Sequence, residues 1–169
     1  ETALMLAIRE NSPQCVEALI EAGADLDLQA DDGNTGLMIG VQGGQVSMLR
    51  RLIDAGCNVN LSNQMGYSAL MISAQRGLID CVEMLLKIAD LDQRHEATGN
   101  TAVMWAAMTG NNIGLSMLVT AGATLYLKNN SSQTALDLAR MNGNTNAVKL
   151  LGLGFPNFDT HPAAQLVDI

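Results

Sequence analysis

The sequence predicts an all-α solenoid, a stack of helix-turn-helix layers joined by hairpin loops. One observation is a motif of Thr or Ser, a small residue, an aliphatic residue and then Met or Asp, which returns every 33 residues, at Thr2, Thr35, Ser68, Thr101 and Thr134. A second is a leucine at the same spacing, at Leu19, Leu52, Leu85, Leu118 and Leu151. A fixed period in this range is typical of stacked repeats, in which each layer contacts only its neighbours.

The second copy of the motif shows why each layer should contain two helices. Thr35 can cap a first helix, because its hydroxyl accepts a hydrogen bond from a backbone N–H that would otherwise be unpaired. That helix should end near Gln42, before two glycines. A second helix over about 46–55 then carries aliphatic residues on one face. Gly56 can adopt the left-handed conformation that ends it.

The other copies follow this plan with local departures. Pro13 falls at the start of the second helix of the first layer, where its missing N–H costs little. The third layer has no glycine after its second helix, so 87–90 is one residue short, and the following loop at 94–98 is one residue longer. The longer loop should restore the register. Chance insertion and a role in binding both explain this pair of changes.

These residues resemble the ankyrin repeat, whose pattern is close to Gly-x-Thr-Pro-Leu-His followed by a helix and Gly-Ala-Asp-x-Asn. Segments 22–27 and 55–60 match its end. The resemblance covers residues 1–154 and implies five repeats, at about 1–33, 34–66, 67–99, 100–132 and 133–154. Residues 155–169 have lost the repeat, and we expect either a capping tail or a disordered extension.

The chain departs from the family at the His of that pattern. Met or Asp stands there in every copy, at Met5, Met38, Met71, Met104 and Asp137. A thioether cannot donate a hydrogen bond, and methionine packs softly in irregular spaces. We therefore expect these methionines in the core of the stack, and not at a metal or cofactor site.

Charge and composition restrict the class of partner. The net charge is −8, and residues 1–33 hold eight acidic residues with Arg9 as their only base. This excess argues against nucleic acid, whose phosphates reward clusters of Lys and Arg. It indicates either a partner with a basic patch or a merely solvated surface. No apolar run approaches the ~20 residues of a membrane span. Cysteine usage favours the cytoplasm, while periplasmic and secreted settings stay open.

Residues suited to catalysis are few. The two histidines, His95 and His161, fall in a loop and in the tail, and no phosphate-loop or H-E-x-x-H motif is present. A Cys–His pair would need Cys15 or Cys81 at the surface, and we expect both to be buried core residues. The sequence therefore predicts a protein that is not an enzyme, with no cofactor and no metal.

The resemblance instead implies a binding face formed by the loops and the first helices. Carrying over the family's contact positions gives the expected partner-binding set of Asp31, Asp32, Met65, Tyr67, Gln75, Arg76, Trp105, Met108 and Thr109. Among these, Met65, Tyr67, Trp105 and Met108 bring together residue types that are enriched at interface centres. The competing interpretation is that Trp105 packs against the next layer and Tyr67 only shields a loop.

The expected function is a non-catalytic protein-interaction module, an adaptor or scaffold that binds its partner in the concave face. On its own the chain is expected to be a monomer. Two alternatives stay open. One is an inhibitor or immunity-type protein that blocks a partner enzyme, and the other is the targeting part of an enzyme whose catalytic part lies outside this chain.

Overall fold

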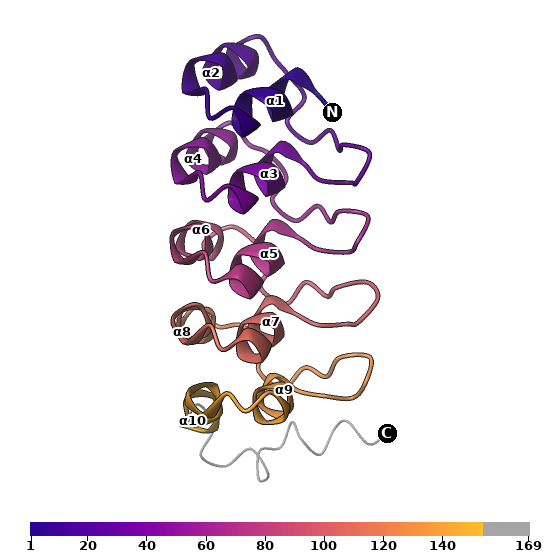
Figure 1. Cartoon of the computed structure of the whole chain (residues 1–169), viewed down its shortest axis with the longest axis vertical. Coiled ribbons are helices and arrows are strands. Elements are labelled where there is room, and N and C mark those ends of the chain that lie inside the picture. Colours follow the sequence, from indigo (N-terminus) through magenta and orange to yellow (C-terminus); the bar gives the residue numbers. More distant parts are fainter. Residues whose placement is uncertain (154–169) are drawn as a thin grey trace.

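A computed structural model describes residues 1–153, which form five pairs of helices stacked along one axis (Figure 1). The predicted all-α layered solenoid is confirmed. The pairs are α1 (Ala3–Arg9) with α2 (Pro13–Glu21), α3 (Gly36–Gln42) with α4 (Val46–Asp54), α5 (Ala69–Arg76) with α6 (Ile79–Leu85), α7 (Ala102–Thr109) with α8 (Asn112–Thr120), and α9 (Ala135–Met141) with α10 (Thr145–Leu153). The predicted tail at 155–169 lies outside the described residues.

The repeated Thr or Ser begins each first helix, as the sequence predicts. The hydroxyl of Thr35 accepts a hydrogen bond from the backbone N–H of Met38 at 3.3 Å, and the Ser68 hydroxyl accepts one from Met71 at 3.5 Å. Gly56 adopts a φ of +86° after α4, also as predicted. Thr101 differs, because its side chain makes no cap hydrogen bond. The first helices therefore share one start signal, with the fourth layer as the exception.

The core runs along the stack between consecutive layers. The first helices pack on one another, α3 on α1, α5 on α3, α7 on α5 and α9 on α7. The repeated methionines lie in this core, fully buried at Met5, Met38, Met71 and Met104. Asp137, the fifth residue of the series, instead completes a capping box with Thr134. The prediction that the methionines are core residues is confirmed.

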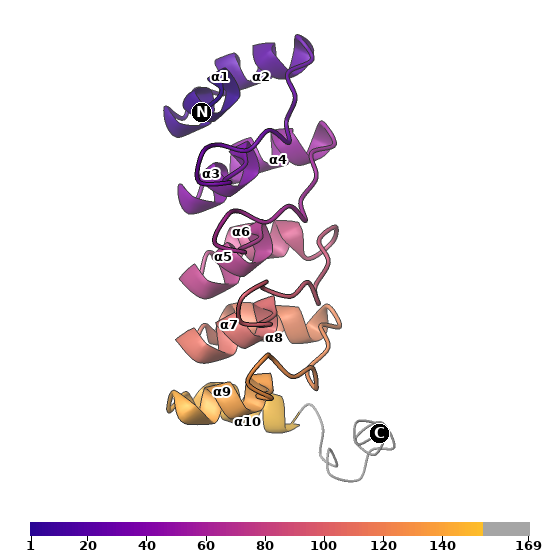
Figure 2. The same cartoon turned by 90° about the vertical axis from the view of Figure 1, so that its right-hand side faces the viewer.

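The loops between layers project from one side of the stack as hairpin turns, here called fingers (Figures 1 and 2). They span 30–34, 63–67, 95–100 and 129–133, and are numbered one to four in chain order. Each is closed by two backbone hydrogen bonds, which in finger two run from the Asn63 N–H to Tyr67 O at 3.0 Å and from the Gly66 N–H to Asn63 O at 2.8 Å. The loops are less regular than the predicted β-hairpins. In residues 1–153 the only pairing of strand type is an isolated bridge between Ser62 and Ser68.

The third layer keeps its register despite its altered loop. In the second layer, the Asn58 N–H donates to Asp27 Oδ1 at 2.7 Å, and in the fourth the Thr124 N–H donates to Asp92 Oδ1 at 2.8 Å. The shortened segment makes the equivalent bond from the Asp90 N–H to Asn60 Oδ1, at 2.8 Å. Finger three then contains the extra residue. The longer finger therefore compensates for the shorter helix end, as expected.

Candidate functional site

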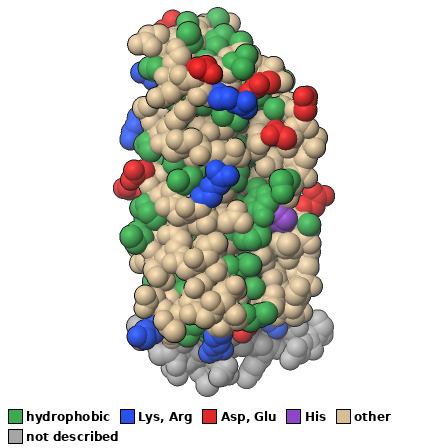
Figure 3. Space-filling view, viewed as in Figure 1, with side chains coloured by type: hydrophobic (Ala, Val, Ile, Leu, Met, Phe, Trp, Pro, Cys, Tyr) green, Lys and Arg blue, Asp and Glu red, His purple; other side chains and the backbone are tan. Residues whose placement is uncertain are grey.

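The fingers and the first helices border one face of the stack. Figure 3 shows that a patch of hydrophobic side chains lies beside a histidine about halfway along this face, and that acidic side chains gather toward the N-terminal end. In the described part of the chain the histidine is His95. The apolar patch therefore lies at the third and fourth layers, where the sequence places the candidate contacts.

The predicted apolar contacts divide into surface and interior residues. Met65 is 70% exposed, and Tyr67 and Met108 are half-buried. Trp105 is only 8% exposed and belongs to the core. The interpretation of Trp105 as a direct partner contact is therefore corrected, because the Tyr67 ring packs against it at a centroid distance of 5.3 Å. Trp105 supports the surface residue and does not form the surface itself.

A histidine that sequence reasoning left in a loop completes this group. The His95 ring lies 4.5 Å from the Tyr67 ring and 5.7 Å from the Trp105 ring, edge to face in both cases. We call Tyr67, His95 and Trp105 the aromatic cluster. His95 occupies the position that Asn63 and Asn129 occupy in fingers two and four. The extra residue of finger three is the sequence signal that could have drawn attention to it.

The aromatic cluster replaces hydrogen bonds found at the neighbouring joints. Between fingers one and two, Asn63 Nδ2 donates to Asn34 Oδ1 at 2.9 Å. Between fingers three and four, Asn129 Nδ2 donates to Asn100 Oδ1 at 2.8 Å. Among the described residues, no hydrogen bond joins finger two to finger three. The central joint of the face is thus apolar and aromatic where its neighbours are polar.

Two of the polar candidates, Asp32 and Arg76, line a hollow of about 380 Å³ toward the N-terminal end of the same face. Asp32 accepts hydrogen bonds from the N–H and the side-chain amide of Asn34, and the backbone bond lowers the pKa of its carboxyl. Arg76 also lines the hollow and makes no ion pair within residues 1–153. Of the remaining candidates, Asp31 and Thr109 are exposed and Gln75 is half-buried.

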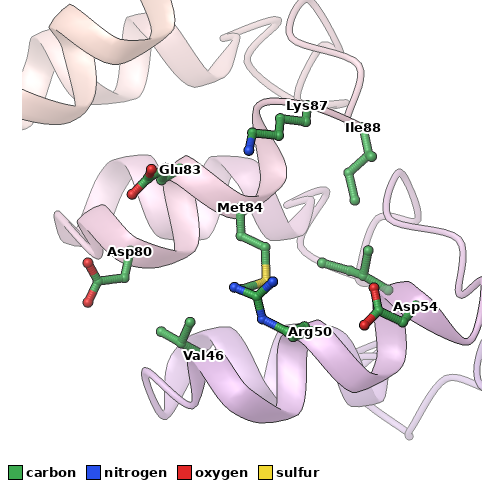
Figure 4. A pocket seen from close by; sticks show the side chains of 9 residues that line it. Val46, Arg50, Asp54, Asp80, Glu83, Met84, Lys87 and Ile88 are labelled. Atoms are coloured by element: carbon green, nitrogen blue, oxygen red, sulfur yellow. The ribbon is translucent and has the colours of Figure 1, made fainter.

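A second hollow lies on the helical back, between α4 and α6 (Figure 4). It measures about 370 Å³ and is lined by both apolar and charged side chains. Its lining residues are Val46, Arg50, Ile53, Asp54, Asp80, Glu83, Met84, Lys87 and Ile88. Side chains of both charge signs surround this hollow, so it selects no class of partner by charge.

The cysteines show one clear departure from the sequence prediction. Cys81 is buried as expected, but Cys15 is exposed on α2. The two positions are equivalent in the repeat, yet α2 packs only on α1 and α4, whereas α6 packs on both α4 and α8. In the described residues, no layer precedes α2 to cover Cys15. In residues 1–153 no three His, Cys, Asp or Glu side chains gather as metal ligands would, and no helix there could cross a membrane.

We expect the thiol of Cys15 to react before the thiols of Cys57 and Cys81. Burial, with Asp27 nearby, raises the pKa of Cys57 to about 11, and burial also raises the pKa of Cys81. At about pH 8 both stay thiols in the folded protein, and only a thiolate attacks an alkylating reagent. Iodoacetamide should therefore label Cys15 first, as peptide mass spectrometry would show. If Cys81 in the folded protein were labelled as fast as Cys15, that result would contradict the burial of Cys81.

Comparison with known families agrees with this architecture. A family model of ankyrin repeats, three copies long, matches residues 4–95 and again residues 88–159. No curated protein sequence matches the chain. Ankyrin repeats generally serve as protein–protein interaction modules, and they are typically non-catalytic. Because the matches cover most of the sequence, the chain belongs to the ankyrin-repeat family.

Proposed function

We propose that this ankyrin-repeat protein binds a partner protein at the centre of its concave face, as a non-catalytic adaptor or scaffold. The observation that carries the proposal is the apolar patch of Met65, Tyr67 and Met108, which lies at the one joint where the fingers are not hydrogen-bonded to each other. An exposed apolar patch with a polar border is typical of a protein-interaction site.

The patch combines a movable side chain with a fixed one. Met65 extends into solvent, and methionine adapts to the shape of a partner at little cost. The ring of Tyr67 is held by its contacts with His95 and Trp105, so partner binding would restrict the motion of this side chain only a little more. Met108 borders the patch, and its sulfur accepts a hydrogen bond from Asn100 Nδ2 at 3.6 Å. The pair Tyr67 and Met108 is therefore the expected anchor.

The acidic N-terminal end would orient the partner. Asp31 and Asp32 are exposed in finger one, and most of the acidic residues of 1–33 lie in the same part of the stack. Complementary charges at the edge of an interface raise the association rate more than the affinity. We therefore expect the partner to carry a basic patch beside the segment that contacts the apolar patch, and its association rate to fall with added salt.

Tyr67→Ala and Met108→Ala should each weaken partner binding by about 1 kcal/mol or more, which is roughly a fivefold rise in Kd. Each substitution removes apolar area from the proposed contact, and because Tyr67 also covers Trp105, circular dichroism should first establish that the Tyr67→Ala variant is folded. Isothermal titration with a partner captured from the native organism's lysate would measure the effect. Ile113→Ala, which removes an exposed side chain from α8, is the matched control. Equal losses for the control would contradict the proposed site.

One observation favours a second role, that of an inhibitor covering a partner enzyme's active site. Finger three alone contains an extra residue and contributes His95 to the aromatic cluster. A single specialised finger is better suited to the recognition of one particular partner than to the role of a general scaffold. If the captured partner is an enzyme whose activity falls in proportion to the bound fraction, this second role replaces the adaptor.

A further inference from the structure

The methionines of the chain differ sharply in exposure, and all ten lie in the described residues. Five are at most 1% exposed, at Met5, Met38, Met48, Met71 and Met104. Three are half-buried, at Met84, Met108 and Met117. The remaining two, Met65 and Met141, are 70% and 69% exposed. A dissolved oxidant therefore reaches the sulfur atoms of Met65 and Met141 far more readily than any sulfur in the core.

Met65 is the exposed methionine that lies in the proposed patch. It stands at the tip of finger two, two residues before Tyr67. Gly66, between them, lies against finger three, since a Cβ there would be 3.3 Å from the backbone nitrogen of Glu96. Met141 lies in the fifth layer, near the end of α9 and outside the patch. A chemical change at Met65 would therefore alter the patch, and the same change at Met141 would not.

The side chain of Met65 does not hold finger two together. Asn63 does so, because its Oδ1 accepts the N–H of Met65 at 3.1 Å and the N–H of Tyr67 at 3.0 Å. One period away on either side, fingers one and four carry Asp32 and Ser131 at the same position, so this position accommodates a polar side chain. A polar group at Met65 should therefore change the surface of the finger and leave its fold intact.

The sulfur of Met65 is also the least engaged on this face. Within residues 1–153 it accepts no hydrogen bond, whereas Sδ of Met108 accepts one from Asn100 Nδ2 at 3.6 Å and Sδ of Met141 accepts one from Gln133 Nε2 at 2.9 Å. Both lone pairs of the Met65 sulfur are thus free to react with an electrophilic oxidant.

Hydrogen peroxide is an oxidant that suits such a sulfur. A lone pair of the thioether attacks one peroxide oxygen, the O–O bond breaks and an S–O bond forms. The hydroxide that leaves takes the proton of the sulfur-bound oxygen and becomes water. The sulfur loses two electrons, the peroxide is reduced, and the product is methionine sulfoxide.

We propose that Met65 is a redox-modification site, whose oxidation by a peroxide releases the partner. The inference rests on the proposed function and adds the regulation of that same patch. The sulfoxide oxygen is polar, and an apolar partner surface offers it no hydrogen bond, so covering it costs free energy. Methionine sulfoxide reductases reverse the step. Two thiols then supply the electrons and become a disulfide, the sulfoxide oxygen leaves as water, and the thioether binds again.

Three variants isolate the role of Met65. Met65→Leu keeps an apolar side chain of similar volume that peroxide does not oxidise. Met65→Gln places an uncharged polar group at the same position, and so imitates the sulfoxide without any oxidant. Met141→Leu is the matched control, because it removes the other strongly exposed methionine. Both positions lie at the surface, so all three variants should fold, and circular dichroism compared with the wild type would establish that they do.

The probe is a synthetic dodecapeptide without Met, Cys or Trp, selected from random peptides displayed on phage. It is kept only if Tyr67→Ala weakens its binding. The chain alone is treated with dilute hydrogen peroxide, catalase removes the excess, and peptide mass spectrometry locates the added oxygen. Oxidation should reach Met65 and Met141 and spare Met71 with the other core methionines.

Binding of the probe is then measured for each chain before and after peroxide. The Kd of the wild type and of Met141→Leu should rise about fivefold or more after treatment. Met65→Leu should keep its affinity, and Met65→Gln should bind weakly without treatment. Incubation of the oxidised wild type with methionine sulfoxide reductase and dithiothreitol should restore the original Kd.

The outcomes separate this inference from the proposed function. If Met65 is oxidised and the Kd does not change, the inference is overturned, while the effect of Tyr67→Ala leaves the proposed function in place. A Met65→Leu chain that loses affinity after peroxide overturns the inference too, because another side chain is then responsible. If the selection yields no peptide whose binding Tyr67→Ala weakens, the proposed function itself is contradicted.

Discussion

Met71→Ala should lower the free energy of unfolding by about 2–5 kcal/mol, the range for truncating a buried Met. Met71 lies in α5, in the third of five layers, and is 1% exposed. Its helix packs on α3 and on α7, so the cavity would weaken the contacts of one layer with both neighbours. Urea denaturation followed by circular dichroism would measure the loss.

The control for this prediction is another methionine. Met141 lies near the end of α9 and is exposed, so Met141→Ala should change the free energy of unfolding by no more than about 0.5 kcal/mol. The comparison separates burial from any general effect of removing a methionine. If Met71→Ala were no more destabilising than Met141→Ala, the methionines of the repeat motif would not be core residues.

Gly33→Ala should destabilise the stack by about 2 kcal/mol or more, because a left-handed backbone and a backbone clash would act together. Gly33 has a φ of +78° in finger one. A Cβ there would overlap the backbone nitrogen of Gln64 and lie 2.9 Å from the carbonyl carbon of Asn63, both in finger two. The two fingers would have to separate, breaking the bond from the Gln64 N–H to Asp32 O.

Gly56→Ala isolates the conformational part of that effect. Gly56 has a similar φ of +86°, but a Cβ there would meet no atom within 4 Å. Its substitution should cost only the left-handed strain of about 1–2 kcal/mol. Thermal unfolding of both variants would give the difference. Equal losses would show that fingers one and two are not in close contact.

The sequence predicts those parts of the fold that depend on local chemistry. A threonine before a helix needs only its own neighbours to form a cap, so Thr35 is correctly placed from the repeat alone. Gly56 likewise needs only its missing Cβ to end α4. The repeated Met71 position is correct because a fixed period puts equivalent residues at equivalent places between layers.

The features that were missed depend on contacts between layers. Cys15 shares its repeat position with Cys81, but only Cys81 has a layer on each side. His95 is buried because Tyr67 and Trp105 come from two other segments to meet it. No property of the finger's own sequence encodes that meeting. The same contacts bury Trp105, which the sequence alone left undecided between the core and the surface.

The most direct test of binding at the central joint is hydrogen–deuterium exchange of the chain with and without its captured partner. Binding in the concave face predicts slower exchange in fingers two and three, at 63–67 and 95–100, and near Met108 at the end of α7. Exchange in α4 and α6 should stay unchanged. Slower exchange confined to α4 and α6, around the hollow on the helical back, would contradict the proposed site and move the partner to the opposite face.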